Sequence, residues 1–134
     1  MDDAVILVVD DEEMLRKLLF KILDKEGYNV LLASSGREAL DIISRERVDL
    51  IVTDVKMPEM DGFELLKKAK EKYPRIGVIV MTAFGDAYTV RDALLLGADE
   101  YITKPFKSFE IVMVVERAHW RIQSSSPKEE SPRA

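Results

Sequence analysis

Polar side chains capable of chemistry stand directly after four of the short apolar runs in this sequence. They are Asp10-Asp11-Glu12 after the first run, Asp54 after the third, Thr82 after the fourth and Thr103-Lys104-Pro105 after the fifth. If the runs form parallel strands, their carboxyl ends meet at one edge of a sheet, where sites form in open α/β proteins. The sequence therefore predicts that three aspartates, a threonine hydroxyl and a lysine amine converge there.

Three carboxylates in one small site repel one another, which raises their pKa values and costs stability. A hard divalent cation relieves this repulsion, and a ligand set made only of oxygen suits Mg²⁺. Asp11 and Asp54 are then candidate direct ligands, and Asp10 is a candidate ligand through a water molecule. The Lys104 amine and the Thr82 hydroxyl could bind an anion beside the metal. Such a combination describes a phosphoryl-transfer site, in which a carboxylate can itself be the nucleophile.

The elements that must position these groups alternate along the chain. Apolar runs of strand length occupy residues 4–9, 28–33, 50–53, 77–81 and 100–102, and several are apolar at successive positions, as in strands covered on both faces. Helical patterns fill the intervals: a stripe over residues 14–23 with Gly27 as C-cap, residues 36–45 opened by a Ser35–Glu38 capping box, then 62–72, 87–96 and 108–123 with Ser108 as a cap. Five βα units in series predict a doubly wound α/β domain with helices on both faces of a parallel sheet.

Composition narrows the class of function. The chain has 134 residues, of which 47% are hydrophobic, which suits one domain with its own core. Its net charge of −5, without an evident basic face, argues against direct contact with DNA or RNA. The sequence contains no cysteine, which excludes thiolate chemistry and disulfides. No signal peptide is evident and no segment approaches the roughly 20 apolar residues that span a bilayer, so we expect a cytoplasmic protein without a membrane contact.

The last residues differ in composition from the rest of the chain. From Ser124 to Ala134 the sequence consists mainly of serine, proline and charged residues without an apolar period. We therefore expect one domain over residues 1–123, followed by a disordered tail or the start of a linker over residues 124–134.

The motifs, taken in order, resemble the receiver domains of two-component response regulators. The matching segments are residues 8–12, 54–62, 81–83 and 97–106, and the resemblance covers about residues 4–122. It implies a five-stranded parallel sheet in the flavodoxin-like order 2-1-3-4-5. It also implies a signalling module that takes a phosphoryl group from a sensor histidine kinase and switches conformation to control an effector domain or a partner protein. Residues 81–86 resemble those of receivers in transcription activators, which suggests a transcriptional output.

The resemblance assigns roles around the nucleophile. Asp54 is implied as the phospho-acceptor, and Asp10 and Asp11 as the acidic pair that holds Mg²⁺, with Mn²⁺ as a substitute. Lys56 occupies the position whose backbone carbonyl completes the metal ligands together with Asp54. The module would modify itself in cis and would not act as an enzyme on other substrates.

The resemblance also assigns roles to the groups that sense the phosphoryl group. Thr82 and Tyr101 match the switch pair, and Lys104 matches the family's site lysine, whose bond to Pro105 is expected to be cis. Phe84, two residues after Thr82, is expected to obstruct the hydrolytic water and so to prolong the phosphorylated state.

Each of these residues also has an ordinary structural interpretation. Residues 10–12 could simply cap the following helix, Thr82 could bond to backbone at a strand end, and Tyr101 could be half-buried packing. His119 is interpreted as a residue that stabilises a helix C-terminus, and Trp120 as packing or a local interface.

Two other classes of function use similar elements. A magnesium-dependent phosphohydrolase with an aspartyl nucleophile generally needs a second aspartate two residues later, where this chain has Lys56, and a cap for which 134 residues leave no room. A flavin or nucleotide binder would need a Gly, Ser and Thr loop after the first strand, where residues 10–12 would repel phosphate. Multiple turnover on phosphate esters, or flavin absorbance, would support these alternatives.

Apolar residues in excess of one core-facing stripe occur over residues 87–123. They are Leu94-Leu95-Leu96, Phe106, Phe109, Ile111, Met113 and Val115, with Arg91, Asp92, Asp99, Lys107, Glu110, Glu116 and Arg117 as charges of both signs around them. A self-complementary patch of this kind predicts a two-fold homodimer through the fourth helix, fifth strand and fifth helix, strengthened by phosphorylation.

Overall fold

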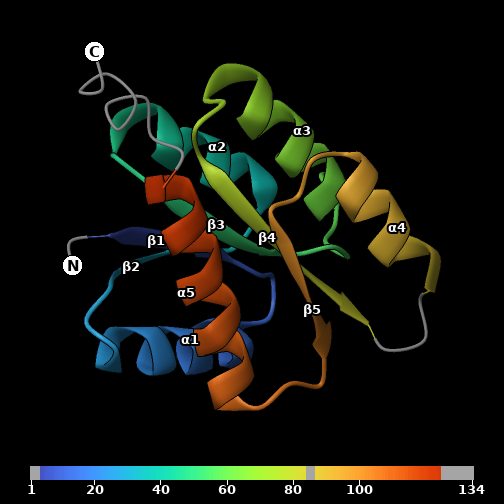
Figure 1. The fold of residues 1–134 in the computed structure, drawn as a ribbon. Coiled ribbons are helices and arrows are strands. Elements are labelled where there is room, and N and C mark those ends of the chain that lie inside the picture. Colours follow the sequence, from blue (N-terminus) through green and yellow to red (C-terminus); the bar gives the residue numbers. More distant parts are fainter. Residues whose placement is uncertain (1–3, 84–86, 125–134) are drawn as a thin grey trace.

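The computed structural model describes residues 4–83 and 87–124, in which five strands alternate with five helices (Figure 1). The elements are β1 (Val5–Val9), α1 (Glu13–Lys25), β2 (Asn29–Ala33), α2 (Gly36–Arg45), β3 (Leu50–Asp54), α3 (Gly62–Lys72), β4 (Gly77–Ala83), α4 (Ala87–Leu95), β5 (Glu100–Lys104) and α5 (Ser108–Ser124). The strands form one parallel sheet in the order β2-β1-β3-β4-β5. The predicted doubly wound fold is therefore confirmed.

Three strands extend further toward the site than the apolar pattern indicated. Asp54 pairs with Met81 in the ladder of β3 and β4, and Ala83 pairs with Lys104 in the ladder of β4 and β5. The backbone ladder thus continues past the apolar residues, because strand pairing needs only the main chain. The polar residues at this edge are held by the sheet itself.

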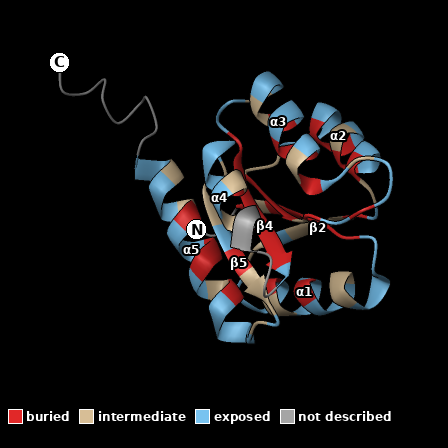
Figure 2. Ribbon diagram, turned by 90° about the vertical axis from the view of Figure 1, so that its right-hand side faces the viewer, coloured by how far each residue is buried: buried red, intermediate tan, exposed pale blue. Residues whose placement is uncertain are grey.

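Both faces of the central strands are buried, which explains their unbroken apolar runs. Leu7 and Val9 of β1 face a core shared with α2 and α3, whereas Ile6 and Val8 face a core shared with α1 and α5. Figure 1 shows these two helical layers, and Figure 2 shows the buried residues concentrated in the strands between them. The fourth helix contributes Ala93 to the first of these cores.

Most predicted helix ends are confirmed. The Ser35 hydroxyl accepts a hydrogen bond from the Glu38 backbone N–H at 3.1 Å, as the capping box requires. Gly27 and Gly97 follow α1 and α4 with φ angles of 97° and 98°, a conformation that favours glycine.

The predicted range of α5 agrees with the structure to within one residue. Ser108, expected as the cap, is the first helical residue, and the Glu110 carboxylate accepts the Lys107 backbone N–H at 2.6 Å. Ser124, which the composition assigned to the tail, is the last residue of the helix. Residues 125–134 lie outside the described part, and the expected tail stays a prediction.

The outer surface confirms part of the predicted apolar excess. Leu94, Leu95 and Leu96 are all exposed, as are Phe109 and Met113. Ile111 and Val115 are fully buried, and Phe106 is half-buried against the same core. The prediction that some of these apolar residues face outward is therefore confirmed, with Phe109 and Met113 as the outward-facing ones on α5.

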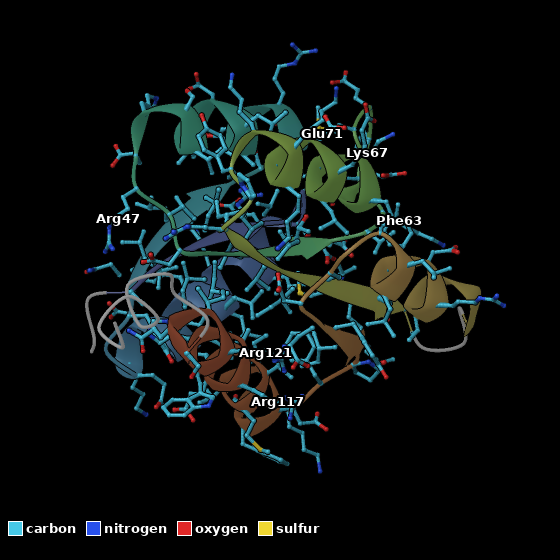
Figure 3. All side chains as sticks on the ribbon, turned by 45° about the horizontal axis from the view of Figure 1, so that its top comes forward. Arg47, Phe63, Lys67, Glu71, Arg117 and Arg121 are labelled. Atoms are coloured by element: carbon cyan, nitrogen blue, oxygen red, sulfur yellow. The ribbon has the colours of Figure 1, made fainter. Side chains whose placement is uncertain are left out.

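Two of the predicted surface charges have partners within the chain. Asp99 Oδ2 accepts hydrogen bonds from Lys70 Nζ at 2.9 Å and from the Val78 backbone N–H at 2.8 Å. Arg117, which projects from α5 beside Arg121 (Figure 3), donates two hydrogen bonds of 2.9 Å to the Glu100 carboxylate. These charges tie β5 to its neighbours within the chain.

The aromatic residues near the end of α5 occupy different environments. His119 packs edge-on against Tyr28, with ring centroids 6.3 Å apart. Trp120 is 71% exposed, so of its two interpretations, packing or a local interface, exposure disfavours packing and the local interface stays a prediction. No helix in residues 4–83 and 87–124 is both long and apolar enough to cross a membrane.

Candidate metal and anion site at the carboxyl edge of the sheet

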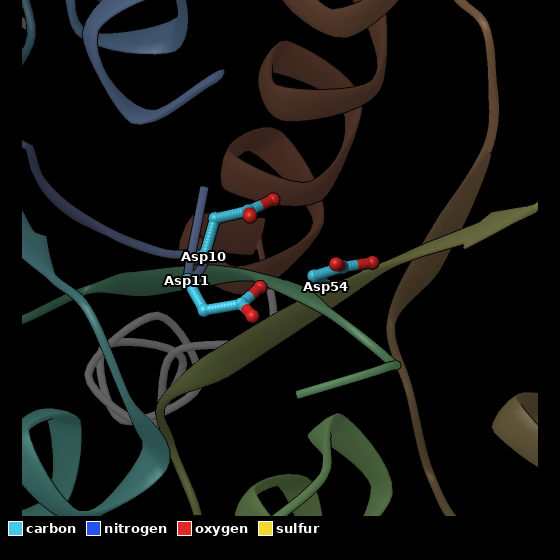
Figure 4. A group of neighbouring side chains, drawn as sticks. All are labelled: Asp10, Asp11 and Asp54. Carbon is cyan, nitrogen blue, oxygen red and sulfur yellow. The ribbon is translucent and has the colours of Figure 1, made fainter. Parts of the chain in front are cut away.

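The structure brings together the three predicted aspartates. Asp10 and Asp11 follow β1, and Asp54 ends the adjacent strand β3, so the sheet order places them side by side (Figure 4). One carboxylate oxygen from each lies within 4.8 Å of the others. This spacing allows all three carboxylates to contact one cation or its water shell.

Asp10 is held rigidly from several sides. Its backbone N–H donates to the Ala33 carbonyl at 3.2 Å, and its Oδ1 accepts the Glu12 N–H at 2.8 Å. Glu12 is the N-cap residue of α1 but makes no side-chain cap bond. Capping therefore accounts for one oxygen of Asp10, whereas Oδ2 is buried without a hydrogen-bond partner among the described residues.

Asp54 is positioned by the close approach of α3 to the end of β3. A Cβ atom on Gly62 would lie 2.2 Å from the Asp54 carbonyl oxygen, so only glycine fits the first position of α3. The Gly62 N–H donates to the Val55 carbonyl at 2.8 Å, which closes the β3–α3 loop. Buried Val55 and Met57 anchor that loop in the core. These contacts fix the backbone on both sides of the acceptor position.

Lys104 reaches the aspartates from the end of β5. Its Nζ lies 3.1 Å from Asp54 Oδ1 and 3.8 Å from Asp10 Oδ2. The expected cis bond between Lys104 and Pro105 is present. The amine therefore lies between two carboxylates, as the proposed anion-binding role requires.

The pKa values of the buried carboxyls show that one lysine does not compensate the site. Burial raises the pKa of Asp10, and the neighbouring Asp54 and Asp11 add to the rise. Burial likewise raises the pKa of Asp54, although Lys104 opposes it. An unsatisfied Asp10 oxygen, an excess of negative charge and a purely oxygen donor set all fit a hard divalent cation such as Mg²⁺.

Thr82 and Tyr101 lie on neighbouring strands with side chains on the same face of the sheet. The register pairs Thr82 with Thr103 and Val80 with Tyr101, so the two residues are diagonal neighbours. Thr82 is 1% exposed, and its Oγ1 lacks a hydrogen-bond partner in the described ranges, which does not support the backbone-bonded interpretation. Tyr101 is 37% exposed, which is compatible both with half-buried packing and with a switch role.

Two further residues were predicted to act at the site. Lys56 is exposed in the loop two residues after Asp54. Phe84 lies outside the described residues, and its shielding role stays a prediction.

One residue that contacts the site was missed from the sequence. Arg16, in the second turn of α1, donates from Nη1 to the backbone carbonyl of Asp10 at 2.7 Å. Because the acceptor is a main-chain oxygen, which every residue has, the sequence at the acceptor position does not indicate this hydrogen bond. The helical spacing that places Arg16 one turn beyond Glu12 was the available signal.

Comparison with known proteins gives the site a context. Residues 6–116 match the family model described as response regulator receiver domain. Sporulation initiation phosphotransferase F of Bacillus subtilis is 43% identical over 111 residues, which cover 83% of this chain and 90% of that protein. Regulatory protein AtoC of Escherichia coli is 38% identical over 93% of this chain, but this covers 26% of AtoC. Transcriptional regulatory protein CpxR of Klebsiella pneumoniae is 39% identical over 95% of this chain and 56% of its own length.

Solved structures agree with the sequence matches. A response regulator receiver domain protein from Clostridium thermocellum superposes with a TM-score of 0.86 at 33% identity, covering 92% of this chain and 99% of the other. NtrX from Brucella abortus gives a TM-score of 0.87 at 33% identity, covering 90% of this chain and 28% of its own. The chain thus spans nearly all of some relatives, and between 26% and 56% of others.

Proposed function

The chain belongs to the response regulator receiver domain family, and we propose that it is a phosphorylation switch in which Asp54 accepts a phosphoryl group from a sensor histidine kinase. The observation that carries this proposal is the cluster of Asp10, Asp11 and Asp54, with Lys104 Nζ 3.1 Å from Asp54. A group of charges this poorly compensated costs stability, and phosphoryl transfer is a use that explains its presence.

Asp54 acts as the nucleophile. One of its carboxylate oxygens bonds to the phosphorus, while the bond from phosphorus to the donor nitrogen breaks and its electron pair stays on the histidine ring. Lys104 neutralises charge on the acceptor and on the incoming phosphoryl oxygens. Asp10, Asp11, Asp54 and the Lys56 backbone carbonyl would hold Mg²⁺, which supplies positive charge to the phosphoryl oxygens. The chemistry modifies the chain itself, so we propose a switch and not an enzyme with external substrates.

Thr82 carries the signal away from the site. Its buried hydroxyl has no hydrogen-bond partner among the described residues, and its O–H could donate to a phosphoryl oxygen. A phosphoryl group can shift the conformation only if it makes different contacts in the two states. We propose that the Thr82 hydroxyl provides that difference, and that Tyr101, on the same sheet face, moves with it.

The effect of phosphorylation on the cell would depend on an effector domain or a partner protein. Since relatives such as CpxR and AtoC are longer than this chain, we propose that the domain controls an effector domain or a separate protein, with transcription as its output. The acidic net charge of −5 supports a role for this domain in which it makes no direct nucleic-acid contact. We place this activity in the cytoplasm, where kinase and effector would meet it.

A second copy of the chain is a proposed partner. Leu94, Leu95, Phe109 and Met113 are exposed on α4 and α5, the two helices that contact β5 with its partly exposed Tyr101. Exposed apolar residues gathered on one face favour association, and a two-fold dimer would pair the face with itself. Sedimentation with and without beryllium fluoride as a phosphoryl mimic tests this, and a monomer in both states would contradict it.

The stoichiometry of phosphoryl uptake tests the proposed function. Incubation with a small phosphodonor and Mg²⁺, followed by intact-mass measurement, should show uptake that saturates at one phosphoryl group per chain. Rapid multiple turnover on phosphate esters would instead identify a phosphohydrolase and contradict the switch.

A further inference from the structure

Arg16 folds back from α1 onto the loop that carries the acidic pair. Its Nη1 donates to the Asp10 carbonyl oxygen at 2.7 Å, in a partly buried setting. This carbonyl belongs to the peptide that links Asp10 to Asp11. The guanidinium therefore fixes the peptide plane from which the Asp11 side chain begins.

The other hydrogen bonds of the loop involve the Asp10 N–H and the Asp10 side chain, and not the Asp10 carbonyl. The Asp10 N–H bonds to Ala33, and Asp10 Oδ1 accepts the Glu12 N–H. These bonds orient Asp10, whose side chain is fully buried, whereas Asp11 is exposed. Arg16 thus acts at the junction between a rigid carboxylate and a more open one.

We propose that Arg16 is a positioning residue that holds Asp11 in register with Asp10 and Asp54 for Mg²⁺, an inference that rests on the proposed function. Groups that orient metal ligands without touching the metal typically change affinity by about 10-fold to 100-fold when they are removed. Arg16 meets that description through a main-chain oxygen.

Because Arg16 is positively charged, the direction in which its removal changes Mg²⁺ affinity tests the inference. A cation near a site repels Mg²⁺, so removing it should raise metal affinity if charge alone mattered. Loss of positioning should lower affinity instead. The direction of the change therefore separates a positioning role from a purely electrostatic one.

Lys17 provides the matched control. It is the next residue of α1, carries the same charge, and pairs with Glu13 at 3.1 Å while its side chain is 71% exposed. Lys17→Gln removes a positive charge from the same helical turn without touching the Asp10 carbonyl.

The experiment is calorimetric titration of Mg²⁺ into the parent, Arg16→Gln, Arg16→Lys and Lys17→Gln, at a temperature where circular dichroism shows each to be folded. We expect Arg16→Gln to bind about tenfold more weakly, Arg16→Lys to recover part of the loss, and Lys17→Gln to bind as the parent does or slightly more tightly. Parent-like or tighter binding by Arg16→Gln would overturn the inference while leaving the metal site intact. A parent that binds no Mg²⁺ would overturn the proposed function itself, and the inference with it.

Discussion

A cluster of charged residues lies at each end of β5, and the two clusters differ in how well their charges are paired within the chain. At its amino end, Glu100 receives two hydrogen bonds from Arg117 and a further one from Arg121, and the preceding Asp99 binds Lys70. At its carboxyl end, Lys104 faces two of three clustered aspartates, and one Asp10 oxygen is left without a hydrogen bond among the described residues. The carboxylates of the first cluster are paired with basic residues of the chain, whereas the negative charge of the second exceeds what Lys104 can balance and fits a bound cation.

The pKa values express the same difference. The Arg117 guanidinium, joined by Arg121, holds the pKa of Glu100 below its ordinary value of 4.5. Burial raises the pKa of Asp10 and Asp54 above their ordinary value of 3.8. Folding thus favours the ionised form of Glu100 and disfavours the ionised forms of the two aspartates. Charge at the amino end stabilises the fold, and charge at the carboxyl end is retained at a cost in stability.

The largest expected effect concerns metal binding. Asp11→Asn removes a carboxylate from the aspartate cluster and should weaken Mg²⁺ binding at least about tenfold, the lower range for residues that merely support metal ligands. Glu100→Gln, at the other end of β5, should leave the affinity unchanged. Calorimetry measures both affinities. It is preferable to tryptophan fluorescence, because Trp120 lines a groove with Asp49 and Arg75 and not with Asp10, Asp11 or Asp54. Equal affinities for Asp11→Asn and the parent would show that the aspartates do not hold the metal.

The two ends should respond with opposite signs in stability. Without metal, Asp11→Asn relieves repulsion on Asp10 and Asp54 and should stabilise the fold by about 0.5–1 kcal/mol. Glu100→Gln leaves two arginines without a carboxylate and should destabilise the fold by about 1 kcal/mol. Urea unfolding at neutral pH in the presence of a chelator gives both values. If both variants lost stability, the contrast between the two ends would be wrong.

The dependence of stability on pH should also differ between the ends. Because the folded-state pKa of Asp54 is raised, its favourable contribution is complete below the unfolded pKa and is lost as pH rises through the folded one. Asp54→Asn should therefore exceed the parent in stability at pH 7, and its advantage should shrink on acidification toward pH 4, by about 1 kcal/mol or less. The pKa of Glu100 is lowered, so its contribution is complete above the unfolded pKa and disappears as pH falls through the folded one. The deficit of Glu100→Gln should accordingly persist from pH 7 to about 5 and close only as the pH falls below the ordinary value of 4.5.

The smallest effect on stability is expected at Thr82. Its hydroxyl has no partner among the described residues, so Thr82→Val should change the free energy of unfolding by less than about 0.5 kcal/mol or stabilise the fold. The matched control is Thr53→Val on the adjacent strand, because Thr53 is equally buried and donates to the Asp54 carbonyl at 3.0 Å. That change should cost about 1 kcal/mol.

Phosphorylated Thr82→Val provides a second test of the same residue. It should still take up the phosphoryl group but lack the shift of the Tyr101 NMR resonances that we expect in the phosphorylated parent. A full shift in the variant would show that the Thr82 hydroxyl does not couple the site to Tyr101.

The sequence was sufficient to predict what depends on local pattern and strand order. Apolar runs identified all five strands, and the polar residues after them identified Asp10, Asp11, Asp54, Thr82 and Lys104 as neighbours. Contacts between distant positions were not predictable, because pairs such as Lys70 with Asp99, or Arg117 with Glu100, leave no local periodicity. For the same reason Arg16 was missed, and the sequence did not distinguish the outward-facing Phe109 and Met113 from the buried Ile111 and Val115.

The assignment of Asp54 is the central claim, and one comparison of intact masses tests it directly. The parent and Asp54→Asn are incubated side by side with a small phosphodonor and Mg²⁺, and the parent is also incubated with excess chelator. The parent with Mg²⁺ should gain one phosphoryl group, while the variant and the chelated parent should gain none or gain it far more slowly. Uptake by Asp54→Asn at the parental rate would contradict the assignment.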